Sequence, residues 1–190
     1  MAIAEFPTIE RIPMSMEEFE RIPEGPPFYD YIDGEAIKLN KPTGRHQRIE
    51  MRLANALFEF TSTRRLGEVY HNIDVKLPVG NWVGPDIVFI AAEHMDRYNQ
   101  QKGDLYGAPD LAVEISSPPT ATYDRIVKLE QYQLSEVPWL WIVDQDHLAV
   151  EEYQWTPDGY LRVGGALGSE TFRPHLFDGL EIDLATLTGL

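Results

Sequence analysis

Two short apolar runs, each joined to a single acidic residue, constrain the fold of this chain most. Asp86 opens the run 87–90, and Glu114 closes the run 111–113. Runs of this length and composition are typical of strands that are buried on both faces of a sheet. An ionised acid at such a position is costly unless a cation meets it. We therefore expect a shared cationic partner, for which a divalent metal is the most economical candidate.

The length and composition indicate one globular domain. The chain has 190 residues, of which 43% are hydrophobic and 25% are charged, close to the averages of globular proteins. Its longest apolar stretches have the length of strands and not of membrane spans, so we expect no membrane partner. We expect a single domain over 1–190, with an extension and short helix at 1–27, a core at 28–155, and a hairpin and tail at 156–190.

The N-terminus and the absence of cysteine favour a cytoplasmic protein, because neither a secretory signal nor a disulfide framework is present. The net charge of -15 argues against general affinity for nucleic acid, which depends on Lys and Arg. Arg45, Arg48 and Arg52 nevertheless share one side of an expected helix. They form either a phosphate-binding stripe or a solvated helix face with Glu50 nearby.

The first half of the chain alternates helices and strands. Ser15 is typical of a helix N-cap, and Asp33-Gly34 between two β-prone runs predicts a tight hairpin. Apolar residues at helical spacing predict an amphipathic helix over 44–60, with His46 on its apolar stripe. Alternation over 69–77 predicts one strand.

The second half continues this pattern. The polar segment 93–107 is either a short helix or a functional flap. We then expect the Glu114 strand, stopped by Pro118-Pro119, a helix over 123–134, a buried strand over 139–143, and a hairpin turning at Asp158-Gly159. The segment 180–184 fits an edge strand or the start of a last helix. This order of elements favours an α/β sandwich with a mixed sheet.

Several spaced motifs resemble the Uma-type family of putative restriction endonucleases, which belongs to the PD-(D/E)xK nuclease superfamily. The resemblance covers roughly Tyr29 to Tyr153, and residues 179–184 are similar in style. Motifs that agree in order are far more specific than any one of them. The motifs that carry the resemblance are Tyr31-Ile32-Asp33-Gly34-Glu35, His46, Pro85-Asp86-Ile87-Val88, Pro109-Asp110-Leu111-Ala112-Val113-Glu114-Ile115-Ser116-Ser117-Pro118, Asp124 with Lys128 and Tyr132, and Trp141-Ile142-Val143-Asp144.

The resemblance implies a restriction-endonuclease-like sandwich, with a mixed central sheet, flanking helices and peripheral β-hairpins. It implies Asp86, Glu114 and the Ile115 carbonyl as metal ligands, with a lysine near the attacked phosphate. The chain departs from the superfamily pattern at Ser116, where lysine is usual. In Uma-type proteins the lysine lies on the following helix, and Lys128 occupies the matching place.

Each candidate also has an ordinary structural interpretation. Lys128 follows Asp124 by four residues, which suits a helical ion pair. Glu35 either completes the carboxylate set or is a turn residue, and His46 is either a phosphate contact or base or a buried, hydrogen-bonded histidine. Glu114 would need an edge strand to face solvent, which its apolar neighbours disfavour.

The resulting interpretation is a Mg²⁺-dependent DNA endonuclease, with Mn²⁺ as a substitute, in which Asp86 and Glu114 hold the metal and Lys128 acts on the water or the phosphate. The resemblance implies DNA as partner and a homodimer, although no sequence feature fixes the oligomer. A catalytically silent relative that serves as a binding module is the alternative, favoured by the net charge and by Ser116. A two-carboxylate hydrolase acting on sugars is a third option, which would need neither metal nor Lys128.

Overall fold

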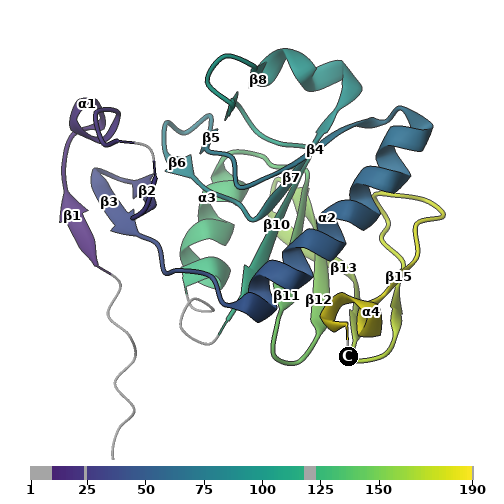
Figure 1. The fold of residues 1–190 in the computed structure, drawn as a ribbon. Coiled ribbons are helices and arrows are strands. Elements are labelled where there is room, and N and C mark those ends of the chain that lie inside the picture. The colour runs from purple at the N-terminus through teal and green to yellow at the C-terminus, as the bar shows by residue number, and fades with distance from the viewer. Residues whose placement is uncertain (1–9, 24, 118–122, 190) are drawn as a thin grey trace, which may run out of the picture.

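The computed structural model describes residues 10–23, 25–117 and 123–189, which form two large mixed sheets and a few helices (Figure 1). The α/β sandwich with a mixed sheet is therefore confirmed. The first nine residues and the pair Pro118-Pro119, which we expected to stop a strand, lie outside the described residues.

The central sheet has six strands in the order β13-β12-β11-β10-β7-β4. The pair β10 and β11 is parallel, and the other neighbouring pairs of this sheet are antiparallel. All six residues of β10 are buried, so Glu114 lies in a covered central strand and not on an edge. The strands are β4 (Gly67–His71), β7 (Ile87–Ala91), β10 (Leu111–Ser116), β11 (Trp139–Asp144), β12 (Ala149–Thr156) and β13 (Gly159–Leu167).

The second sheet has seven short strands in the order β1-β3-β2-β6-β5-β9-β8. The expected hairpin is β2–β3, and its turn residues Asp33 and Gly34 have φ values of 51° and 85°, as a tight two-residue turn requires. The strands are β1 (Arg11–Pro13), β2 (Tyr29–Ile32), β3 (Glu35–Lys38), β5 (Val75–Lys76), β6 (Trp82–Val83), β8 (Tyr98–Asn99) and β9 (Asp104–Tyr106).

The helix expected from Gly44 is α2 (Gly44–Arg64), which lies across one face of the six-stranded sheet (Figure 1). The Thr43 side chain accepts a hydrogen bond from the His46 N–H and caps the start of the helix. The buried stripe of α2 packs against the side chains that this sheet face presents, and each large apolar side chain so buried contributes roughly 1.5–3 kcal/mol. The stripe comprises Ile49, Leu53, Leu57 and Phe60, and its partners in the sheet include Ile87, Val113, Ile115 and Trp141.

The opposite face of the sheet is covered by the helix expected over 123–134. This helix begins as a π-helix, η2 (Tyr123–Lys128), and continues as α3 (Leu129–Leu134). Tyr123 and Tyr132 pack with Ala112, Leu140 and Ile142 in a second apolar cluster. π-helical turns are rare in proteins, and those that occur are often found at functional sites.

The prediction of one strand over 69–77 is wrong, because the chain changes sheets within it. β4 ends at His71 in the six-stranded sheet, and β5 begins at Val75 in the seven-stranded sheet. Between them Asn72 adopts a left-handed conformation with φ 53°, which ends a regular strand. Alternation of polar and apolar residues does not reveal such a change, since it continues through the turn.

The remaining elements flank the two sheets. The short-helix interpretation of segment 93–107 is partly right, since the segment contains most of a 3₁₀ helix, followed by two short strands of the second sheet. Both readings of segment 180–184 are partly right, since a strand is followed directly by a helix. These elements are α1 (Met16–Phe19, capped by Ser15), η1 (Ala92–Arg97), β14 (Thr171–Phe172), β15 (Ile182–Asp183) and α4 (Leu184–Thr188).

The three arginines expected on one side of α2 bind backbone carbonyls. Arg45 donates to the Gln145 carbonyl (2.7 Å), Arg48 to the Thr188 carbonyl (2.9 Å), and Arg52 to the Thr186 carbonyl. Arg48 and Arg52 thus fasten α4 to α2. This structural role supports neither a phosphate-binding stripe nor a purely solvated helix face. Within the described part of the chain, no helix has the length and apolar character needed to cross a membrane.

Candidate functional site

Asp86 lies at the centre of the candidate site, directly before β7. Its Oδ2 accepts a hydrogen bond from the Ile115 N–H (2.6 Å), and its Oδ1 lies 3.2 Å from His46 Nε2. The antiparallel registers pair Ile87 with Val113 on one side and with His71 on the other. Continuing these registers by one residue places Asp86 in a row between Glu114 and Asn72.

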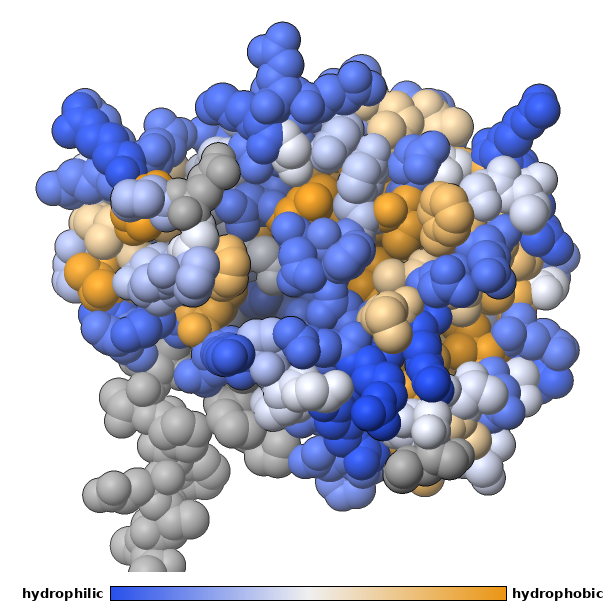
Figure 2. Space-filling model, viewed as in Figure 1, coloured by the Kyte–Doolittle hydropathy of each residue, from blue (hydrophilic) through white to orange (hydrophobic). Residues whose placement is uncertain are grey.

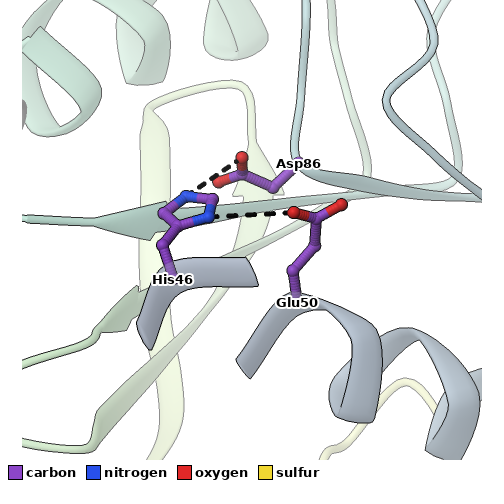
Figure 3. Close-up of side chains that lie close together, drawn as sticks. All are labelled: His46, Glu50 and Asp86. Atoms are coloured by element: carbon purple, nitrogen blue, oxygen red, sulfur yellow. Dashed lines mark ion pairs between the residues drawn. The ribbon is translucent and has the colours of Figure 1, made fainter. Parts of the chain in front are cut away.

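On the α2 side of Asp86, three side chains form a compact cluster (Figure 3). One ligand atom each from His46, Glu50 and Asp86 lies within 4.8 Å of the other two. The imidazole of His46 stands between the carboxylates, with Nε2 toward Asp86 and Nδ1 3.7 Å from Glu50 Oε2. Because residues four apart lie on the same face of a helix, α2 presents His46 and Glu50 together.

The other oxygen of Glu50 is held from the end of β4. Asn72 Nδ2 donates to Glu50 Oε1 (2.9 Å), and His71 Nδ1 lies 3.1 Å from the same oxygen. Burial, followed by the charge of Asp86, raises the pKa of Glu50 despite the two histidines. Burial lowers the pKa of His46, but its contact with Asp86 and the charge of Glu50 outweigh this, so the pKa is raised overall.

The His46 ring has a buried donor or acceptor that lacks a partner. His46 Nδ1 has no hydrogen-bond partner among the described residues, since 3.7 Å to Glu50 is too long. Buried polar atoms are rarely left in this state. A ring nitrogen facing a carboxylate at this separation suits a divalent cation held between them.

On the opposite side of Asp86, Glu114 is neutralised by a lysine. Lys128 Nζ donates to Glu114 Oε2 (2.9 Å) and Oε1 (3.2 Å), and Tyr132 OH donates to Oε1. Lys128 also donates to the Gly84 carbonyl (3.0 Å), in the loop that leads to Asp86. Glu114 and Lys128 are only 2% and 4% exposed, so this is a buried ion pair.

A second carboxylate, Asp30 of β2, lies near the same lysine. Asp30 is fully buried, and its Oδ2 is 3.8 Å from Lys128 Nζ and accepts a hydrogen bond from Tyr123 OH (2.6 Å). Its Oδ1 accepts from the Gly84 N–H (2.8 Å). Asp30 therefore connects the hairpin of the second sheet to the π-helix and to the loop before Asp86.

The pKa directions on this side follow from burial and from mutual charge. Burial raises the pKa of Glu114 far above its usual range, although Lys128 opposes this. Burial lowers the pKa of Lys128, but the charges of Asp30 and Glu114 raise it by more, so the pKa is raised overall. Burial and the charge of Glu114 also raise the pKa of Tyr132, so its hydroxyl stays protonated and donates.

The structure brings most of the predicted site residues together. Asp86, His46, the backbone of Ile115, Glu114 and Lys128 are linked by the contacts above. Ser116, in the usual lysine position, donates to the Val143 carbonyl (3.4 Å). The lysine beside the glutamate comes instead from η2.

Glu35 is not brought to this group. Its carboxylate pairs with Arg11 of β1 (3.1 Å), and both side chains are partly exposed. The hairpin that carries it sends Asp30 toward the site instead. A helical ion pair with Asp124 is not the main role of Lys128, because its ammonium donates hydrogen bonds to Glu114 and to the Gly84 carbonyl.

Sequence reasoning missed the roles of Glu50 and Asp30. Glu50 carried a signal, since it follows His46 by four residues and so shares its helix face. Asp30 carried no such signal, since the sequence of a hairpin strand does not indicate which of its residues contacts a distant lysine. Glu114 was expected at a strand end, but β10 continues to Ser116. Strand alternation therefore directs its side chain away from the α2 face.

The arrangement contains the groups needed for metal-assisted hydrolysis. Carboxylate oxygens and an imidazole nitrogen are ligands for divalent cations, and here they converge at one end of the central sheet. A buried lysine lies on the other side of the shared aspartate. This geometry could hold a cation and place positive charge close to a bound anion.

Comparisons with known proteins agree with the fold and identify the family. No curated protein matches the chain. A solved structure, described as a putative nuclease belonging to DUF820 from Anabaena variabilis, is similar with a TM-score of 0.74 and 18% sequence identity, over 93% of this chain and 98% of that one. The family model Uma2, described as putative restriction endonuclease, matches residues 16–185. The chain therefore belongs to the Uma2 family of putative restriction endonucleases, as the motifs around Asp86 and Glu114 suggested.

Proposed function

We propose that this protein is an endonuclease that hydrolyses phosphodiester bonds of DNA with the help of a divalent cation. The observation that carries the proposal is the cluster of His46, Glu50 and Asp86, in a chain of a nuclease family. These residues come from α2 and from the loop directly before β7, and the same loop accepts a hydrogen bond from the buried Lys128 at the Gly84 carbonyl.

The donor set fits a divalent cation. Asp86 and Glu50 supply oxygen, and His46 Nδ1 supplies a nitrogen that otherwise lacks a partner. Mg²⁺ typically needs one or two carboxylates plus water and substrate, so the two acids suffice for it. Mn²⁺ would also take these oxygens, and His46 is the ligand that could distinguish the two ions. When bound, such a cation polarises a phosphate oxygen and lowers the pKa of a water molecule.

The chain's own residues then have separate roles. Asp86 is the shared ligand, kept in place by the Ile115 N–H. Glu114 holds Lys128 close to Asp86, and Lys128 neutralises the charge that grows on the attacked phosphate. Ligation by Glu114 and by the Ile115 carbonyl remains a prediction from the sequence, and for Glu114 it requires that Lys128 release one carboxylate oxygen.

The charge of the protein makes substrate binding depend on the cation. The net charge is -15, and hydrophilic side chains dominate the face that carries α2, with apolar residues scattered among them (Figure 2). Counterion release from DNA phosphates by Lys and Arg therefore contributes little. We expect DNA binding to be weak in chelator and to strengthen when Mg²⁺ or Mn²⁺ is added.

The test is cleavage of supercoiled plasmid, single-stranded DNA and RNA in Mg²⁺, Mn²⁺ and excess chelator. We expect cation-dependent nicking of DNA by the wild-type protein, and a loss of at least about 100-fold in Asp86→Asn, because the shared ligand is removed. Asp96→Asn, an exposed aspartate on η1, is the matched control and should cleave normally. Cleavage by Asp86→Asn at the wild-type rate would refute the site. Cation binding without cleavage of any nucleic acid would instead leave a binding module.

A further inference from the structure

Asn72 contacts both carboxylate residues of the cation cluster. Its side-chain amide donates to Glu50 Oε1 (2.9 Å), and its backbone N–H donates to the Asp86 carbonyl (3.3 Å). One residue at the end of β4 thus touches a ligand from α2 and the residue that opens β7.

The backbone conformation of Asn72 makes both contacts available. Asn72 has φ 53°, in the left-handed region, at the point where the chain leaves the six-stranded sheet. Asparagine tolerates this conformation better than most residues that have a Cβ. The turn keeps the N–H directed at Asp86 while the side chain reaches across to Glu50.

The chemistry of the amide suits a carboxylate that must stay able to bind a cation. An amide nitrogen donates hydrogen bonds but carries no charge, so it fixes Glu50 Oε1 without neutralising the carboxylate. This leaves Glu50 Oε2 facing His46 Nδ1. The contrast with Glu114 is direct, because there the donor is the ammonium of Lys128 and the charge is compensated. Whichever nitrogen of His71 carries a proton, the amide of Asn72 remains a donor to Glu50.

We propose that Asn72 is a positioning residue of the cation site, which orients Glu50 for ligation and ties its position to that of Asp86. The proposal rests on the cation-dependent function above. Groups that orient metal ligands typically affect metal affinity by 10–100-fold. Asn72 itself is exposed and touches neither cation nor phosphate in this assignment.

The test compares Mn²⁺ binding, followed by electron paramagnetic resonance and titration calorimetry, in the wild-type protein, Asn72→Gly and Asn55→Ala. Glycine retains the left-handed backbone and its N–H, so only the amide is lost. Asn55 is a matched control, because it also donates to a glutamate, Glu59 (3.0 Å), on the exposed face of α2. We expect Asn72→Gly to weaken Mn²⁺ binding by roughly tenfold or more, with an unchanged thermal midpoint in chelator. Asn55→Ala should bind as the wild-type protein does.

Cleavage supplies a second readout. Excess Mn²⁺ should restore the rate of Asn72→Gly but not that of Asp86→Asn, because only the affinity is impaired in the former. If Asp86→Asn abolishes Mn²⁺ binding while Asn72→Gly binds as tightly as the wild-type protein, the assignment of Asn72 is overturned and the proposed function stands. If the wild-type protein binds no Mn²⁺, both are overturned.

Discussion

The two sides of Asp86 hold buried carboxylates in opposite ways. On the α2 side, Glu50 accepts a hydrogen bond from the neutral amide of Asn72 and lies beside the imidazoles of two histidines, whereas on the other side Glu114 is paired with the ammonium of Lys128. A lysine competes with a metal for the same negative charge, and an amide does not. Burial alone therefore does not identify a metal ligand. The charge of the donor that orients the carboxylate distinguishes a residue available to a cation from one already compensated.

The difference has a geometric origin in the sheet. Glu114 lies inside β10, where alternation directs its side chain to the face covered by η2 and α3. Asp86 and Asn72 lie just beyond the ends of β7 and β4 and are not bound by that alternation. They can therefore turn toward α2. A residue one position outside a strand reaches groups that the strand itself cannot reach.

The largest effect should come from the lysine side. Lys128→Met leaves Glu114 and Asp30 buried without the lysine ammonium that compensates both carboxylates. The free energy of unfolding should fall by roughly 3–5 kcal/mol. Denaturant unfolding in chelator measures the loss, and Lys41→Met, at an exposed position, is the control. A loss below about 1 kcal/mol would mean that Lys128 is not the main counter-charge.

Glutamine at the two glutamates should affect stability in opposite directions. Glu114→Gln breaks the buried pair with Lys128 and should cost roughly 2–4 kcal/mol. Glu50→Gln removes a buried carboxylate that repels Asp86 and is bound by the amide of Asn72 instead of by an ammonium, so the metal-free protein should become slightly more stable, by less than about 1 kcal/mol. Thermal and denaturant unfolding in chelator at pH 7 measure both. Losses of equal size would remove the distinction between the two sides.

The fold could be predicted from the sequence further than the site could. Periodicity and turn residues predicted α2, the β2–β3 hairpin and the Glu114 strand, because these signals are local. The change of sheet at Asn72 left no periodic signal. At the site, Asp86 and Glu114 were indicated by the apolar runs beside them, and the role of Lys128 came from motif resemblance. The contact of Asp30 with the lysine depends on the packing of two sheets, which no local pattern specifies.

The pH dependence of cation binding should depend on His46. The pKa of His46 is raised by Asp86 and Glu50 despite burial, so without a cation the protonated ring stabilises the folded state, and this contribution is lost as the pH rises through that pKa. Protonated imidazole is not a ligand. The apparent Mn²⁺ affinity should therefore fall as the pH falls through the pKa of His46, by about tenfold per unit below it. Titrations from about pH 5.5 to 8.5 should show a shallower dependence in His46→Gln, and equal slopes would exclude His46 as a ligand.

The smallest effect is expected at Glu35. Its pair with Arg11 is exposed, so Glu35→Gln should change the free energy of unfolding by no more than about 0.5 kcal/mol and leave Mn²⁺ binding unchanged. Denaturant unfolding and plasmid nicking measure the two quantities. A large loss of cleavage with normal stability would restore Glu35 to the carboxylate set.

The most direct test of the distinction between the two sides is the Mn²⁺ dissociation constant of Glu50→Gln and of Glu114→Gln, measured by titration calorimetry at one pH. If the cation binds on the α2 side, Glu50→Gln should weaken binding by at least about tenfold more than Glu114→Gln does. Loss of binding in Glu114→Gln with near-normal binding in Glu50→Gln would place the cation between Asp86 and Glu114, and would contradict the account.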